Sequence, residues 1–319
     1  MRAAQVKAIG DLPEPVELDE PAPADGQSLI AVTSAALNPV ELRVAAGRMP
    51  GAIAPYVPGL EGVGTIITSS TLPAGTRVRF ENDLPGFGKD GALREIAVAE
   101  ETALLELPSS VDDSTAAAAG VVGVTAELAI RLAGMQGEER VAVLGATGGV
   151  GQMAVQLAAV REAGSVVAVG RHRPRLDWLR ANGATASIDL TEPADLTEIL
   201  IKAAGGPLDV VVDALWGAPA MDAIEALAEG GRLVNVGNTA GTEVELPLQA
   251  MRKARSSVIG LSSGWTPMSE KLDAYRFVIG QLAAGAIELN VDRVPLESIG
   301  SAWSRQAQFP HTKIVVSLV

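Results

Sequence analysis

The chain contains the glycine-rich turn Leu144-Gly145-Ala146-Thr147-Gly148-Gly149-Val150-Gly151, which links an apolar run at residues 141–144 to an apolar segment at 149–163. Such a turn between a predicted strand and a predicted helix is typical of a site that binds the pyrophosphate of a dinucleotide. Glycine at 148 lets the backbone approach the phosphates, and glycine at 151 permits close packing of helix against sheet. The free amides at the helix N-terminus can bind the anion. A tight strand–helix connection in any α/β protein is the alternative, and the flanking elements favour dinucleotide binding.

Strands and helices alternate from this turn onward. Apolar runs at residues 141–144, 166–169, 210–212 and 233–236 are expected to be strands, with helices between them, for example at 149–163 and 175–181. Strands that are apolar on both faces and separated by helices indicate a parallel sheet covered by helices. The sequence therefore predicts a doubly wound α/β domain of the Rossmann kind at residues 119–264.

The first third of the chain has a different character. Short β-type runs at residues 28–33, 64–68, 76–80 and 93–97 alternate with Pro and Gly clusters, which predicts a compact, largely antiparallel β domain. Residues 112–114 can cap a helix that continues to residue 132. A helix at 270–284 and a strand at 313–318 are expected to return to this domain, which would then comprise residues 1–118 and 265–319.

Composition restricts the possible partners. The 319 residues carry a formal net charge of −13, which disfavours nucleic acid and anionic membranes and favours a small-molecule substrate. There is no cysteine, so disulfides, thiolate nucleophiles and cysteine-ligated metals are excluded. The N-terminus lacks the apolar run of a signal peptide, and the most apolar stretch, 116–130, is interrupted by Glu127 and too short to span a bilayer. A cytoplasmic location is expected.

The residues after the second predicted strand indicate which dinucleotide binds. An NAD site places a carboxylate there for the ribose 2′-hydroxyl, whereas this chain has Gly170-Arg171-His172-Arg173-Pro174-Arg175. Guanidinium groups bind a 2′-phosphate well. A solvated basic turn is the alternative, but cations are disfavoured at a helix N-terminus, so an anionic ligand explains them better. NADPH is the predicted cofactor, and replacing Gly170 by Asp together with Arg171 by Ala should shift preference toward NADH.

Six segments carry a resemblance that covers nearly the whole chain. They are Asn38-Pro39-Val40-Glu41, Pro58-Gly59-Leu60-Glu61-Gly62-Val63-Gly64, Gly123-Val124-Thr125-Ala126, the turn from Gly145 to Gly151, residues 227–237, and Thr312-Lys313-Ile314-Val315-Val316. In order and spacing they resemble the zinc-free quinone oxidoreductase-like branch of the medium-chain dehydrogenase/reductase superfamily. That resemblance implies a GroES-like catalytic domain beside the Rossmann domain, and a homodimer formed through residues 257–262.

The resemblance also implies a set of functional residues. Asn38 would lie near the nicotinamide, Gly148, Gly149 and Val150 would hold the pyrophosphate, and Arg171 and Arg175 would face the 2′-phosphate. The full set of implied cofactor-binding residues is Asn38, Thr125, Thr147, Gly148, Gly149, Val150, Gly170, Arg171, Arg175, Leu215, Gly237 and Ser262. For Asn38 the alternative is an ordinary turn residue before Pro39.

The chain departs from the family pattern at the substrate pocket. Arg43 and Met49 stand where family tyrosines line that pocket, and Leu190 replaces a tyrosine near the adenosine phosphate. Arg43 is expected to be a solvated helix residue, with contact to the substrate as the alternative. Glu41 and Glu61 are expected to be structural, through hydrogen bonds to the backbone.

The implied chemistry is hydride transfer without a metal. Leu60 occupies the position of the histidine that binds catalytic zinc in related alcohol dehydrogenases, and cysteine ligands are absent. Without a Lewis acid, hydride delivery is easiest to an acceptor that delocalises the incoming charge itself. The expected reaction is therefore NADPH-dependent reduction of a quinone or an α,β-unsaturated carbonyl.

Two other functions compete with this one. Gly260-Leu261-Ser262-Ser263-Gly264 fits the nucleophile elbow of a serine hydrolase, with Asp273 or Asp292 and His311 downstream. An elbow is followed directly by a helix, however, and Pro267 interrupts one here. The other alternative is a nucleotide-binding protein with little turnover, because a fold can be kept when its catalytic activity is lost.

Overall fold

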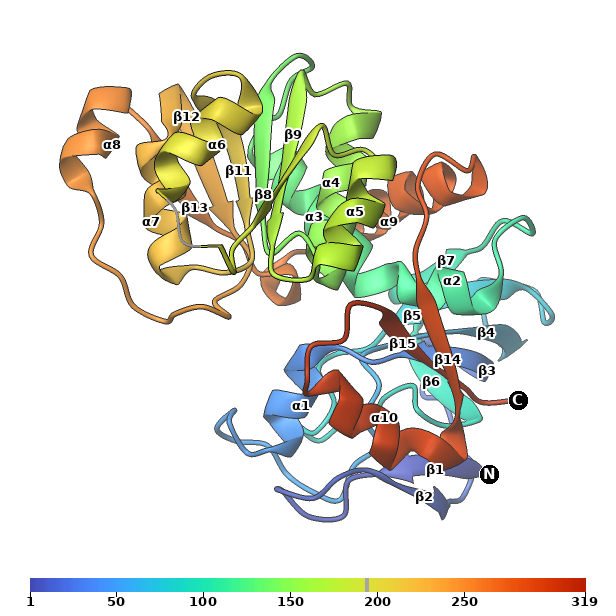
Figure 1. The fold of residues 1–319 in the computed structure, drawn as a ribbon. Coiled ribbons are helices and arrows are strands. Elements are labelled where there is room, and N and C mark those ends of the chain that lie inside the picture. The colour runs from blue at the N-terminus through green and yellow to red at the C-terminus, as the bar shows by residue number, and fades with distance from the viewer. Residues whose placement is uncertain (193–194) are drawn as a thin grey trace. The chain divides into compact units, whose positions relative to one another are not determined.

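The computed structural model describes residues 1–192 and 195–319, which form two compact units. Unit 1 comprises residues 1–121 and 267–319, and unit 2 comprises residues 122–266 (Figure 1). Among the residues described, no helix is long and apolar enough to cross a membrane.

Unit 1 is built on a mostly antiparallel sheet, as predicted. Its strand order is β14-β15-β3-β4-β5-β7, with β6 also pairing with β3, and only the β14–β15 pair is parallel. The strands are β3 (Gln27–Ala36), β4 (Glu61–Thr68), β5 (Arg77–Glu81), β6 (Ile96–Glu100), β7 (Leu104–Glu106), β14 (Val291–Pro295) and β15 (Lys313–Ser317), beside the separate hairpin of β1 (Arg2–Gln5) and β2 (Glu14–Glu17). The pairing of β15 with β3 confirms that the C-terminal segment returns to the first domain.

The helices of unit 1 connect these strands and cover their core. They are α1 (Pro39–Ala45), α2 (Asp113–Ala118), α9 (Met268–Ala283) and α10 (Ile299–Gln306). Asp112 caps α2 by accepting the N–H groups of Ser114 and Thr115, as expected. The single helix predicted to continue to residue 132 is divided at Ala119, because α2 ends at Ala118 and a second helix begins at Gly120. The core of unit 1 includes Phe80 of β5 and Trp303 of α10.

The structure moves the start of one predicted strand of unit 1 three residues later in the chain. The apolar run at residues 93–97 suggested a strand from Leu93, whereas β6 begins at Ile96. The amides of Ala92 and Leu93 donate to the carbonyls of Gly59 and Pro58 in a tight crossing, so pairing with β3 starts only afterwards. Local composition does not reveal such a nonlocal turn.

Unit 2 is a six-stranded parallel sheet in the order β10-β9-β8-β11-β12-β13, which confirms the doubly wound prediction. Its strands are β8 (Arg140–Leu144), β9 (Ser165–Gly170), β10 (Ala186–Asp189), β11 (Leu208–Asp213), β12 (Leu227–Asn235) and β13 (Ser257–Gly260). Its helices are α3 (Gly120–Leu132, which begins in unit 1), α4 (Gly149–Val160), α5 (Arg173–Ala181), α6 (Leu196–Ala204), α7 (Gly217–Glu225) and α8 (Leu248–Ala254). The strand order reverses between β8 and β11, and ligands of such sheets bind outside the strand ends at that point.

Candidate functional site

The turn between β8 and α4 has the geometry of a phosphate-binding loop. A Cβ at Gly151 would lie 2.3 Å from the carbonyl oxygen of Gly145 and 2.6 Å from the Cα of Ala146, so glycine there permits close packing, as predicted. A Cβ at Gly148 would meet only the Gly145 oxygen at 3.5 Å, an ordinary contact. Packing inside the protein therefore does not require glycine at 148. The first-turn amides of α4 lack intrahelical acceptors, so the open backbone fits a bound pyrophosphate.

The basic loop, by which we mean the turn after β9 and the first turn of α5 (residues 171–175), has its arginines in two groups. Arg173 lies 3.9 Å from Asp189 and 3.6 Å from Glu192, and is partly neutralised by them. Arg171 is exposed, and the guanidinium of Arg175 stacks 5.0 Å above the ring of Trp178, with its Nε buried and unpartnered. Arg171 and Arg175 therefore supply the positive charge that this loop can offer to a phosphate.

Gly170 is in close contact with the phosphate turn. A Cβ on Gly170 would lie 2.6 Å from Cγ2 of Thr147, which is itself buried. Any side chain introduced at Gly170 must therefore displace Thr147. The shift toward NADH expected for Gly170→Asp together with Arg171→Ala stays a prediction.

The remaining implied residues of unit 2 lie at the carboxyl ends of its strands or beside them. Leu215 follows β11, and its Cδ2 would lie 3.2 Å from a Cβ on Gly145, so it borders the phosphate turn. Gly237 follows β12. Thr125 on α3 donates to the hydroxyl of Ser263, the neighbour of Ser262, at 3.0 Å. A 3₁₀ turn at Ser263–Trp265 follows Ser262, whereas a nucleophile elbow leads into an α-helix, which argues against the hydrolase alternative.

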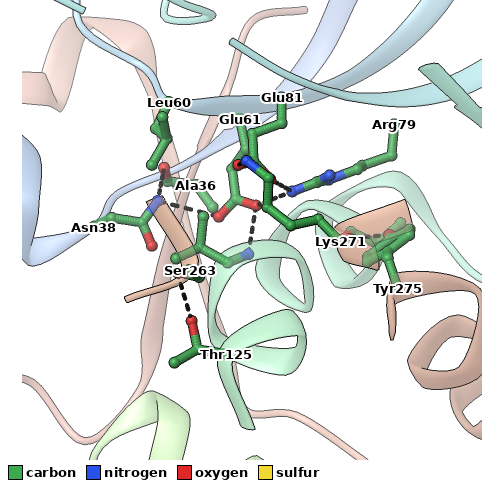
Figure 2. Close-up of polar contacts among 12 residues, drawn as sticks. Ala36, Asn38, Leu60, Glu61, Arg79, Glu81, Thr125, Ser263, Lys271 and Tyr275 are labelled. Atoms are coloured by element: carbon green, nitrogen blue, oxygen red, sulfur yellow. Dashed lines mark hydrogen bonds and ion pairs between the residues drawn. The ribbon is translucent and has the colours of Figure 1, made fainter. Parts of the chain in front are cut away.

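Unit 1 contains a buried ionic network that the sequence did not reveal (Figure 2). Arg79 is fully buried, and its Nη2 lies 3.2 Å from Glu61 and 2.6 Å from Glu81. Glu81 also accepts Lys271 of α9 at 2.5 Å, and Arg79 lies over the ring of Tyr275 at 4.9 Å. Burial opposes ionisation of Glu81, but Arg79 and Lys271 outweigh it and hold its pKa below the usual range.

The network extends to Asn38. Its Nδ2 donates to Glu61 at 3.1 Å, and its Oδ1 accepts Lys313 of β15 at 2.5 Å. Glu61 also accepts the backbone N–H of Val121, so part of its role is structural, as expected. The side chain of Asn38 is thus held by two charged groups, and its place beside a nicotinamide stays a prediction.

The two residues that replace pocket tyrosines differ in environment. Arg43 is exposed on α1, the solvated position that was expected. Met49 is half-buried and packs against the core of unit 1. Contact of either side chain with a substrate stays a prediction.

Glu41 is the carboxylate that shapes the start of α1. It accepts the N–H groups of Asn38 at 2.8 Å and of Gly59 and Leu60 at 2.7 Å each, which confirms the structural role expected for it. Burial raises its pKa from 4.5 to about 7, against the effect of these donors and of Lys313.

The raised pKa of Glu41 predicts a specific pH dependence of stability. The folded protein binds this proton more tightly than the unfolded chain does, so the contribution is complete below pH 4.5 and is lost as the pH rises through about 7. Its full size is on the order of 3 kcal/mol. Urea unfolding of the parent and of Glu41→Gln across this range measures it. We expect a flatter profile for the variant, and parallel profiles would contradict the assignment.

Metal-binding side chains do not cluster in the part of the chain that the structure describes. Within residues 1–192 and 195–319, no group of three or more His, Asp or Glu side chains is placed to hold a metal ion.

Comparisons with known proteins agree with this architecture. Residues 24–109 match the family described as alcohol dehydrogenase GroES-like domain, and residues 149–275 match the family described as zinc-binding dehydrogenase. Human quinone oxidoreductase is 30% identical over 274 residues, which cover 82% of this chain and 80% of that protein. A zinc-type alcohol dehydrogenase-like protein of Schizosaccharomyces pombe is 28% identical over 273 residues, covering 83% and 78%. The solved quinone oxidoreductase of Thermus thermophilus, also determined with NADPH, superposes with a TM-score of 0.82 at 26% identity over the full length of both chains.

The two-domain fold, the glycine turn and these relatives define the class of protein. The chain belongs to the medium-chain dehydrogenase/reductase superfamily. Its relatives indicate an oxidoreductase that uses a nicotinamide dinucleotide.

Proposed function

We propose that the protein is an NADPH-dependent, zinc-independent reductase of quinones or α,β-unsaturated carbonyl compounds. The observation that carries the choice of NADPH is the loop after β9, where Arg171 and Arg175 lie and no carboxylate occupies the position that binds a ribose 2′-hydroxyl. The human relative named quinone oxidoreductase supports the acceptor class, and the absence of cysteine supports catalysis without zinc.

The residues of unit 2 would act mainly by binding and orientation. NADPH, when bound, supplies the hydride. The open backbone at Gly148 and the N-terminal amides of α4 would hold the pyrophosphate, and the two guanidinium groups would hold the 2′-phosphate. Leu215 and Gly237 would contact the nicotinamide half, as the resemblance implies.

Replacing Arg171 by alanine tests the proposed phosphate contact. We expect the KM for NADPH to rise about tenfold, because a charge-assisted hydrogen bond to phosphate is lost, while the KM for NADH stays nearly unchanged. Arg173→Ala is a matched control, since it removes the same charge from the same loop but from a residue that lies near Asp189 and Glu192. Steady-state oxidation of both cofactors with a panel of quinones and enones provides the measurement. Equal effects of the two variants would contradict the assignment of Arg171.

A homodimer through β13 belongs to the same proposal. This strand is the last in the order of the sheet, and its residues are exposed or half-buried. An unpaired strand edge can pair with a second copy of itself.

A further inference from the structure

Two loops follow β11 and β12 at the carboxyl edge of the parallel sheet. We call residues 214–217 the β11 loop and residues 236–241 the β12 loop. The N–H of Ala240 donates to the carbonyl of Leu215 at 2.7 Å, and the hydroxyl of Thr239 donates to the carbonyl of Ala214 at 3.2 Å. A Cβ on Gly237 would lie 2.9 Å from the same Ala214 oxygen. The two loops are therefore tied together through their backbones.

One buried carboxylate holds both loops. Asp213, at the end of β11, is fully buried and accepts the N–H groups of Leu215 at 2.8 Å and of Trp216 at 3.0 Å. It also accepts Nδ2 of Asn235 at 2.7 Å, and the same amide nitrogen donates to the carbonyl of Gly237 at 2.7 Å. Burial raises the pKa of Asp213, and these three donors oppose that shift by favouring the charged form.

The β11 loop has a conformation that it would not adopt alone. Trp216 has φ 57° and ψ −159°, a region that residues with a side chain avoid at a cost of about 1–3 kcal/mol. Such backbone persists only where its surroundings impose it, and here Asp213 binds the amide of the strained residue itself. The neighbouring Leu215 borders Gly145 of the phosphate turn, so the shape of the loop decides where this side chain lies.

We propose that Asp213 and Asn235 are positioning residues for the nicotinamide half of the cofactor, acting through the β11 and β12 loops. This inference rests on the proposed function, because it takes Leu215 and Gly237 to contact that half. In the sheet these loops lie on one side of β8, and the arginine loop after β9 lies on the other. Loss of Asp213 should therefore lower the affinity for ligands that contain the nicotinamide half. The affinity for ligands that contain only the adenosine half should stay nearly unchanged.

The test compares two ligands on two variants of one strand. Asp213→Asn removes the charge and turns an NH₂ group toward the existing donors. Asp209→Asn is the matched control near the other end of β11, where Asp209 accepts the N–H of Arg140 at 2.8 Å. We expect Asp213→Asn to raise the Kd of NADPH about tenfold and to leave the Kd of adenosine 2′,5′-bisphosphate nearly unchanged. Asp209→Asn should change neither. Asn235→Ala, which removes one donor from Asp213, should show the same split if Asp213→Asn fails to fold.

A readout independent of catalysis accompanies the titrations. Hydrogen exchange of the peptide that contains Leu215 and Trp216 should accelerate in Asp213→Asn and not in Asp209→Asn, because their amides lose a charged acceptor. An equal loss of affinity for both ligands would show that Asp213 stabilises the whole domain and does not position the nicotinamide half, and would overturn the inference. Unchanged NADPH affinity despite faster exchange would also overturn it. Failure of the parent protein to bind either ligand would instead overturn the proposed function, and this inference with it.

Discussion

Replacing Arg79 by methionine should destabilise unit 1 by about 3–5 kcal/mol, because it leaves two buried carboxylates without their shared cation. Arg79 is fully buried, and its Nη2 forms ion pairs with both Glu61 and Glu81. After the substitution Glu81 keeps the close ion pair with Lys271, whereas the nearest remaining cation to Glu61, Lys313, lies 3.9 Å away. For a unit of this size the loss corresponds to a fall in Tm of at least about 6 °C, measurable by calorimetry.

An exposed ion pair of unit 1 provides the control for that experiment. Arg276 on α9 pairs with Asp273 at 2.5 Å, and its side chain is 60% exposed. Because exposed pairs contribute little, Arg276→Met should leave the Tm nearly unchanged. Similar falls in Tm for the two variants would show that the buried network does not stabilise the unit in the way its geometry indicates.

Alanine at the two glycines of the phosphate turn should have opposite consequences. In Gly151→Ala the new methyl would lie 2.3 Å from a backbone oxygen, so the turn must shift, and we expect a loss of about 1–3 kcal/mol in stability. In Gly148→Ala the methyl meets only an ordinary contact at 3.5 Å, so the Tm should stay nearly unchanged. The same methyl would occupy space that a pyrophosphate needs, and NADPH affinity should fall about tenfold or more.

Calorimetry together with NADPH titration separates the two roles. The pair of variants serves as its own control, because both add one methyl group to the same turn. A normal NADPH affinity in a stable Gly148→Ala protein would contradict the placement of the pyrophosphate at this turn.

The sequence predicted the fold well where the signal is local. Short apolar strands and a glycine turn identified the parallel sheet, and the roles of Gly151 and Asp112 followed from position alone. The close approach of Gly170 to Thr147, which lies 23 positions earlier in the chain, was not predicted. That contact depends on how strand and turn approach each other, which composition does not encode.

The ionic network and the contact of Asp213 with Asn235 could not be predicted from the sequence, because they join residues that are far apart in the chain. Lys271 meets Glu81 across 190 positions, and Lys313 meets Asn38 across 275. Arg79 lies in β5, where charged and apolar residues alternate, a pattern typical of a strand with one solvated face, so no local signal marks Arg79 as buried. Asp213 follows an apolar run at the end of β11, but its partners became visible only with the loops in place.

The ratio of kcat/KM for NADPH and NADH in the unmodified protein tests the choice of cofactor most directly. With one quinone and one enone as acceptors, we expect NADPH to be preferred by about tenfold or more, since at least one guanidinium would bind the additional phosphate. Equal efficiency with both cofactors would contradict the role given to Arg171 and Arg175.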